Sequence, residues 1–255
     1  MKKKTTTVNE YQIRVVAFID ILGFKNIINK SATNVEEFNR IWKALEELKK
    51  FFIRPKNNSQ IKIERELDLD TQIIQVSDSL VISRLIHEQG GIYHLLYDCS
   101  LATHLLINNG FLCRGAIRSG KMYHNDSTIF GPAFIDAYES ESSEKLPIIK
   151  FDEDLFKIVK EFPGPANRGY EDWEISFIKK NCKEIMTGIY YLDYFTDYDD
   201  RVGGGEGTAS LHYVKLRDII VEGLKVANNS SIYEKYRWAA DQFNLTATNF
   251  GLEKI

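Results

Sequence analysis

Apolar, β-branched runs alternate with amphipathic stretches over the first 151 residues of this 255-residue chain. The run at residues 11–20 predicts a buried strand, and Gly23–Phe24 turns the chain into a helix. Apolar positions at helical spacing predict a second helix that ends near Phe52. The order of these and the later elements predicts an α+β fold, an antiparallel sheet with helices of the ferredoxin-like βαββαβ type.

The later elements are predicted from turn residues and apolar periodicity. After a breaker cluster at 55–59, strand-like alternation over 61–76 leads through a Ser-Asp-Ser turn into a strand over 80–85. The remaining predictions are a helix over 95–109, a strand pair over 111–117 and 121–123, a helix over 135–144, a strand over 147–151, and helices over 211–226 and 232–243. We therefore divide the chain into a core, residues 1–151, and a helical extension packed on it, residues 152–255. The extension covers the sheet or extends a dimer interface.

Two aspartates interrupt these apolar runs at strand ends. Asp20 closes the first strand, and Asp78 lies in the Ser-Asp-Ser turn. A carboxylate in such a place is poorly solvated unless it binds a cation, accepts backbone N–H bonds or meets a base. Two carboxylates are what a two-metal phosphoryl-transfer site requires, because hard cations prefer oxygen ligands.

Each acidic feature also has a purely structural interpretation. Asp20 can cap the following helix, and Asp78 can simply occupy a hairpin turn. A third acidic segment, residues 197–207, combines aspartates with consecutive glycines. It is interpreted as a solvated surface loop in preference to a lid or a further metal site.

Composition narrows the class of protein. The net charge of −3 gives no broad electrostatic footprint for nucleic acid. The basic start is followed by polar threonines and not by an apolar segment, and no stretch reaches the apolar length of a membrane span. Three widely spaced cysteines fit neither a disulfide framework nor a zinc site. These features predict a cytoplasmic protein with reduced thiols.

Three motifs in order resemble the class III nucleotide cyclases. Residues 18–24, Phe-Ile-Asp-Ile-Leu-Gly-Phe, are similar to a Phe-x-Asp-Ile-x-Gly-Phe stretch that supplies the first metal aspartate of that family. A second aspartate lies in the following hairpin, and residues 114–120 and 131–137 resemble a third region, although Gly115 follows Arg114 directly. The likeness extends over residues 12–151. Within the class, the Ser-Asp-Ser hairpin and the Ala-Tyr-Glu at 137–139 are most similar to the bacterial pyrimidine cyclases of Pycsar anti-phage defence.

The resemblance implies cyclisation of a nucleoside triphosphate, in which the ribose 3′-hydroxyl attacks the α-phosphate and expels pyrophosphate. It implies two Mg²⁺ or Mn²⁺ ions held by Asp20, Asp78 and the carbonyl of Ile21. Phosphate oxygens would be bound by the backbone N–H groups of residues 22–24, namely Leu22, Gly23 and Phe24. Arg114 is a candidate phosphate ligand or a strand arginine paired with an acid, and Tyr138 is a candidate base-stacking residue or a core tyrosine.

Four positions depart from the purine cyclases. Ile74 stands where they carry a lysine, and Thr128 where they carry an aspartate or a similar group. The pair that reads a purine edge is therefore altered, which disfavours ATP and GTP. Ile135 and Glu139 align with the usual catalytic asparagine and arginine. Loss of these two fits the pyrimidine subgroup and equally fits an inactive domain.

The sequence thus favours a homodimeric pyrimidine cyclase with active sites at the interface, which makes cyclic UMP or cyclic CMP for a separately encoded effector. Uridylate is the preferred base. One alternative is a catalytically inactive, cyclase-like nucleotide sensor. Another is a relative of the palm-type polymerases, although the charge balance offers no channel for nucleic acid. A purely structural domain leaves the paired aspartates unexplained.

Overall fold

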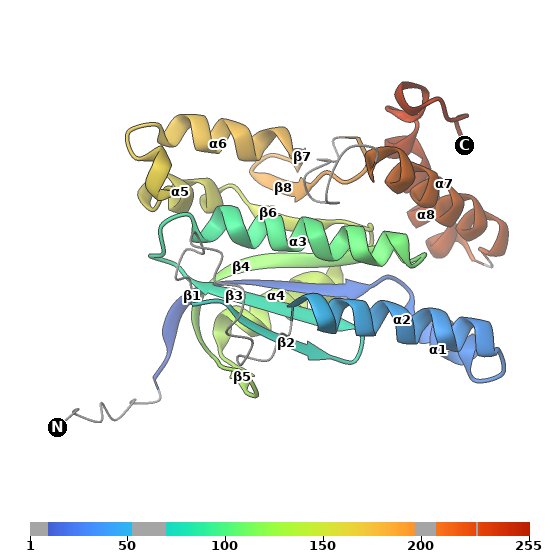
Figure 1. The fold of residues 1–255 in the computed structure, drawn as a ribbon, viewed down its shortest axis with the longest axis horizontal. Coiled ribbons are helices and arrows are strands. Elements are labelled where there is room, and N and C mark those ends of the chain that lie inside the picture. Colours follow the sequence, from blue (N-terminus) through green and yellow to red (C-terminus); the bar gives the residue numbers. More distant parts are fainter. Residues whose placement is uncertain (1–9, 53–69, 197–207, 228) are drawn as a thin grey trace, which may run out of the picture.

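The structure, a computed structural model, describes residues 10–52, 70–196, 208–227 and 229–255. Residues 61–69 of the predicted strand-like segment and the acidic loop at 197–207 lie outside the described residues. The elements, labelled in Figure 1, are β1 (Gln12–Ile21), α1 (Phe24–Ser31), α2 (Val35–Phe52), β2 (Gln72–Val76), β3 (Ser79–Leu85), α3 (Gly91–Asn108), β4 (Cys113–His124), β5 (Ile129–Phe130), α4 (Pro132–Ser143), β6 (Ile149–Asp152), α5 (Asp154–Glu161), η1 (Pro165–Asn167), α6 (Glu171–Lys180), β7 (Cys182–Met186), β8 (Ile189–Leu192), α7 (Thr208–Val226), α8 (Ser230–Phe243) and η2 (Ala247–Phe250).

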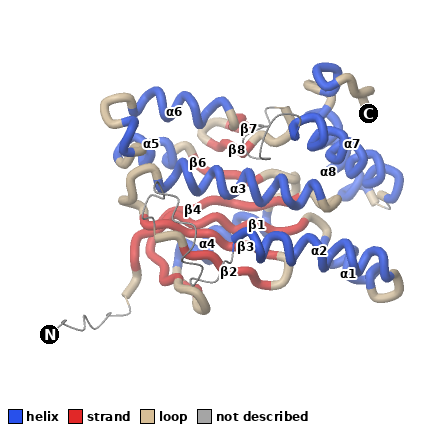
Figure 2. Tube along the Cα trace, viewed as in Figure 1, coloured by secondary structure: helices blue, strands red, loops and turns tan. Residues whose placement is uncertain are grey.

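The strands form one layer, drawn in red in Figure 2, in the order β2-β3-β1-β4-β6-β8-β7, while β5 pairs with β4. β1 lies antiparallel to both β3 and β4, and β2 lies antiparallel to β3. Along the chain, α1 and α2 connect β1 to β2, and α3 connects β3 to β4. This strand order is the ferredoxin-like arrangement, so the predicted α+β core is confirmed.

β1 is covered on both faces because its side chains alternate. Val15, Ala17 and Ile19 belong to a cluster with apolar residues of α2 and α3. Val16 and Phe18 point the other way, into a second cluster with two alanines of α4. Figure 1 shows α2 and α3 in front of the sheet and α4 behind it. The polar residues Arg14 and Asp20 of β1 lie near its ends, and each has a hydrogen-bond partner.

The two C-terminal helices form a third cluster at one end of the sheet. α7 and α8 pack against each other and on Leu22, Ile107 and Leu112. Phe243 is fully buried there and Trp238 is partly buried, as their helical spacing predicts. Because Leu22 directly follows β1, this extension touches the segment that leads out of the central strand. The division of the chain at residue 151 stays a prediction.

The segment after residue 152 is not wholly helical, which corrects the prediction. Residues 182–186 and 189–192 form the hairpin β7–β8, and β8 pairs with β6, which widens the sheet. The hairpin turns at Gly188, whose φ of +76° favours glycine. β7, Cys-Lys-Glu-Ile-Met, is a short and mostly solvated edge strand without a clear apolar alternation, so its sequence carries little strand signal.

Other differences concern element boundaries. The predicted strand pair over 111–117 and 121–123 is one continuous strand, β4. The helices predicted to begin at 95 and 135 begin at Gly91 and Pro132. Proline fits the first turn of a helix because its missing N–H has no intrahelical partner there.

The structure bears on two expectations drawn from composition, the reduced cysteines and the lack of a membrane-spanning segment. Cys99, Cys113 and Cys182 are all buried as free thiols. None of the helices in the described part of the chain combines the length and the apolar character needed to cross a bilayer.

A buried polar network lies near the start of β1. Arg14 is fully buried, and it donates from Nε to Ser83 Oγ at 2.9 Å and pairs with Asp70 through Nη1 at 2.9 Å. The Ser83 hydroxyl also bonds His124 Nδ1 at 2.8 Å. Burial, and then the charge of Arg14, lowers the pKa of His124 to about 4. His124 is thus held neutral at physiological pH.

We predict that this histidine makes the protein sensitive to acid. Because its folded pKa lies below its unfolded value, the unfolded chain binds the proton first as pH falls from about 6.5 to about 4. His124→Gln, which keeps a group able to bond Ser83, should therefore reduce the loss of stability over this window by about 2 kcal/mol. Urea unfolding of the wild type and of His124→Gln at pH 7 and pH 4.5 measures the free energy of unfolding at each pH. If both proteins lost the same free energy of unfolding between these pH values, His124 would not be the source of the acid sensitivity.

Candidate functional site

Asp20 is the polar residue at the exit of the central strand. By the alternation of β1 it lies on the α4 face, like Val16 and Phe18. It is half-buried and pairs in register with Arg114 of β4. The Ser79 hydroxyl donates to Asp20 Oδ1 at 2.9 Å. Asp20 caps no helix, because α1 begins after Gly23 and has no side-chain cap.

Asp78 is brought beside Asp20 by the pairing of β1 with β3. Ser77 and Asp78 form the two-residue turn between β2 and β3, where Val76 pairs with Ser79. Ser77 has a φ of +58°, a conformation in which an L side chain is strained by about 1 kcal/mol. The described residues contain no other non-glycine residue with positive φ. The strain thus falls at the turn that presents Asp78.

The two carboxylates interact strongly. Burial, and then the Asp20 carboxylate, which is close enough to share a proton with Asp78, together raise the pKa of Asp78 to about 7. Two like charges in a half-buried site disfavour double ionisation. In the absence of a cation, the pair therefore holds a proton near neutral pH. The predicted convergence of Asp20 and Asp78 is found.

Arg114 partly compensates this negative charge. Its Nη2 lies 3.8 Å from Asp20 Oδ2, and its Nε forms an ion pair of 2.5 Å with Glu141 Oε1. Its Nη1 donates to the carbonyl of Glu144 at 3.0 Å. In this state Arg114 is an arginine paired with acids, one of its two predicted roles. Its role as a phosphate ligand stays a prediction.

Glu141 is a site residue that the sequence interpretation missed. It is almost fully buried on α4, and burial raises its pKa while the charge of Arg114 opposes the rise. A signal for it was present. Ala133, Ala137 and Glu141 recur every four residues, which places Glu141 on the buried face of the helix.

The turn from β1 into α1 carries the three backbone N–H groups predicted to bind phosphate, and they differ in whether they already donate a hydrogen bond. The N–H of Leu22 donates to the Leu112 carbonyl at 2.9 Å, so this predicted phosphate-binding group is already occupied. Gly23 adopts a φ of +75°, a conformation that glycine tolerates without strain. Within the described residues, no hydrogen bond from the N–H of Gly23 or Phe24 is found, so these two remain candidates. Ile21, the last residue of β1, stays a predicted carbonyl ligand.

The predicted base-recognition residues are not all brought together within one chain. Tyr138 is half-exposed on α4 and meets Phe18 edge to face at 5.6 Å, so it is no core tyrosine. Ile74 packs on the same cluster as Phe18. Thr128 lies in the turn after β4, at the end of that strand opposite to Arg114, where its N–H donates to Asn125. The roles of all three in nucleotide binding stay predictions.

The carboxylate pair has the chemistry of a hard-cation site. The described residues hold no group of three or more histidine, cysteine or acidic side chains that could bind a metal. Mg²⁺ is nevertheless commonly held by one or two carboxylates together with water and substrate phosphates. A cation would also relieve the repulsion that raises the pKa of Asp78. Asp20 and Asp78 therefore fit Mg²⁺ or Mn²⁺.

The chain is similar in structure to several solved nucleotide cyclase domains. No protein-family model matches it, and no curated protein matches it in sequence. It is similar to the adenylyl cyclase CyaB from P. aeruginosa, with 14% identity over 74% of this chain and 98% of the other at a TM-score of 0.42. It is also similar to the guanylate cyclase domain of RhGC from Catenaria anguillulae in complex with GTP, with 13% identity over 73% of this chain and 98% of the other at a TM-score of 0.42. The monomeric guanylyl cyclase domain of RhoGC from Blastocladiella emersonii is 13% identical over 72% of this chain and 95% of the other, at a TM-score of 0.42. The fold assignment rests on the strand order and register of this chain.

We predict that Asp78 destabilises the metal-free protein through its repulsion with Asp20, and that the same residue binds the divalent cation. The pKa of Asp78 is raised in the folded state, so its contribution to stability is present at low pH and lost as pH rises from about 4 to about 7. Without metal at pH 7.5, Asp78→Asn should therefore raise Tm by about 2–4 °C, and by less at pH 5. Mn²⁺ should stabilise the wild type but not this variant.

Thermal unfolding with EDTA or with Mn²⁺ measures both effects. Asp136→Asn, at an exposed aspartate of α4, is the matched control and should respond to Mn²⁺ like the wild type. An equal Mn²⁺ response of Asp78→Asn and the wild type would place the cation elsewhere.

Proposed function

We propose that the protein is a nucleotide cyclase that forms a 3′,5′-cyclic pyrimidine nucleotide, cyclic UMP or cyclic CMP, and pyrophosphate from the triphosphate. The observation that carries the proposal is the convergence of Asp20 and Asp78, with a raised pKa at Asp78, beside the central strand of a ferredoxin-like sheet. The motif resemblance to the class III cyclases supports it, because the same two aspartates are the ones that it singles out.

Each residue near the pair has a defined part in this proposal. Asp20 and Asp78 hold two Mg²⁺ or Mn²⁺ ions, together with the Ile21 carbonyl. When bound, these ions supply activation of the 3′-hydroxyl and neutralisation of the leaving pyrophosphate. The N–H groups of Gly23 and Phe24 bind phosphate oxygens. Arg114 moves its charge from Glu141 toward the substrate phosphates.

The pyrimidine preference rests on two positions without purine-reading groups. Ile74 is apolar and packs among apolar side chains, so it offers no hydrogen bond to a base. Thr128 is exposed and carries no charge. Missing hydrogen-bond partners shift discrimination between bases by a few kcal/mol, about 1–3 for each unpaired group. Uridylate remains the preferred base, and the product serves as an anti-phage second messenger in the cytoplasm for a separately encoded effector.

The active unit is a homodimer with two equivalent sites at its interface. Exposed apolar side chains on the α4 side of the sheet support this, namely Ile135 and Tyr138, each about half exposed. A two-fold dimer that buries this side would bring Tyr138 and Thr128 of one chain toward the aspartates of the other. Such sharing accounts for base-recognition residues that do not meet within a single chain.

A catalytically inactive nucleotide sensor is the second candidate. It is favoured by Ile135 and Glu139, which stand exposed on α4 at the positions of the usual catalytic asparagine and arginine. Against it stands the retained carboxylate pair, because a site without metals gains nothing from two acids that repel each other.

We predict that the purified protein, incubated with each common ribonucleoside triphosphate and Mn²⁺, yields a cyclic pyrimidine monophosphate by mass spectrometry. Asp20→Ala and Asp78→Ala should each lower turnover by at least 10³-fold, because each removes a ligand on which the reaction depends. Circular dichroism should show that both variants fold.

Asp172→Ala, at an exposed aspartate of α6, is the control and should keep full turnover. Absence of cyclic product from every triphosphate would favour the sensor. Unfolding of both aspartate variants would instead assign the pair a structural role.

A further inference from the structure

A cavity of about 320 Å³ lies between the β1–α1 turn, α1 and the C-terminal helix α8. It is lined by Gly23, Asn26 and Lys30 on one side and by Lys235 and Tyr236 of α8 on the other. None of the described residues that line it is acidic. The cavity therefore has the charge and the hydrogen-bond donors of an anion site.

The cavity adjoins the carboxylate pair. Gly23 follows Asp20 by three residues, and the cavity begins at Leu22. Lys235 is half-buried, and its pKa is lowered first by burial and then by the positive charges of Arg114 and Lys145. Lys235 thus lies close to the arginine that contacts Asp20 at 3.8 Å. No ion pair of Lys235 or Lys30 with an acid is found among the described residues.

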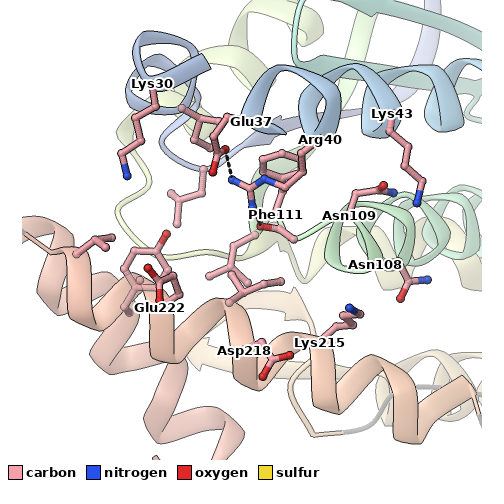
Figure 3. A pocket seen from close by; sticks show the side chains of 18 of the residues that line it. Lys30, Glu37, Arg40, Lys43, Asn108, Asn109, Phe111, Lys215, Asp218 and Glu222 are labelled. Atoms are coloured by element: carbon pink, nitrogen blue, oxygen red, sulfur yellow. Dashed lines mark hydrogen bonds and ion pairs between the residues drawn. The ribbon is translucent and has the colours of Figure 1, made fainter. Parts of the chain in front are cut away.

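A larger neighbouring cavity of about 640 Å³ has a different character. Figure 3 shows it between α1, α2 and the end of α3 on one side and α7 on the other. Acids line it together with the cations, since Arg40 pairs with Glu37 at 2.7 Å and Asp218 and Glu222 also line it. The two cavities share Lys30. The smaller cavity differs in that none of its described lining residues is acidic and in that it adjoins the turn after Asp20.

α8 is fixed firmly enough to present a binding group. Its first turn is capped by Asn229, whose side chain accepts the N–H of Ile232 at 2.9 Å. At its end, Asn244 exchanges two hydrogen bonds with the backbone of Ile255, at 2.8 and 2.9 Å. The helix also packs in one apolar cluster with Leu22. The position of Lys235 relative to the β1–α1 turn is therefore set by packing.

We propose that Lys235, assisted by Lys30, binds the terminal phosphates of the nucleoside triphosphate, so that the C-terminal extension forms part of the substrate site. This inference rests on the proposed cyclase function. A triphosphate whose α-phosphate lies at Asp20 and Asp78 would extend its β- and γ-phosphates along the Gly23 turn into the cavity. The ammonium of Lys235, repelled by its cationic neighbours in the empty site, would gain a counter-charge there.

The test is calorimetric titration with magnesium tripolyphosphate, a probe without base or ribose. Lys235→Met should weaken its binding at least tenfold, and Lys235→Arg should retain most of the affinity. Arg237→Met, on the exposed side of α8 where Arg237 pairs with Asp241 at 3.0 Å, is the matched control and should bind like the wild type. All variants should fold, because Lys235→Met removes a charge that its surroundings disfavour.

Steady-state kinetics provide a second readout. Lys235→Met should raise KM for the triphosphate at least tenfold with a smaller change in kcat. Unchanged affinity and KM in Lys235→Met, or no tripolyphosphate binding by the wild type, would overturn the inference. Binding that depends on Lys235 without cyclic product from any triphosphate would support the phosphate site and overturn the cyclase proposal instead.

Discussion

The pairing of β1 with both of its neighbours is the constraint on which the rest of the structure depends. β3 on one side and β4 on the other fix the register of β1, and its alternating apolar residues are buried between helices on both faces. Asp20 therefore has one position, at the end of the strand on the α4 face. The same pairing carries the β2–β3 turn, and with it Asp78, to the neighbouring position. The two acids are forced together by the sheet.

This enforced proximity organises the residues around it. Ser79 donates to Asp20, and Arg114 contacts Asp20 while it pairs more closely with the buried Glu141. These partners compensate the pair only in part, because burial and the nearby Asp20 still raise the pKa of Asp78 to about 7. A site that retains such repulsion is suited to a ligand that brings positive charge. The cationic cavity next to it is suited to the opposite charge, so the two together match a metal-bound polyphosphate.

Local patterns predicted the elements that carry this arrangement. The apolar run before Asp20, the Ser-Asp-Ser turn and the apolar positions of α8 were sufficient to place them. β7 was missed because a short, solvated edge strand lacks alternation, and Leu22 was assigned to phosphate binding because only the folded chain shows its N–H on Leu112. Glu141 and Lys235 meet the site through contacts between distant parts of the chain. Spacing in the sequence does not encode such contacts.

The central claim is that Asp20 and Asp78 form one divalent-cation site at which a triphosphate is held. A crystal structure with Mn²⁺ and 3′-deoxyuridine triphosphate, which lacks the attacking hydroxyl, tests it most directly. The account predicts anomalous density for Mn²⁺ within about 2.5 Å of an oxygen of each carboxylate, with the triphosphate bound to it. Mn²⁺ bound away from both aspartates, or a triphosphate seated elsewhere on the molecule, would contradict it.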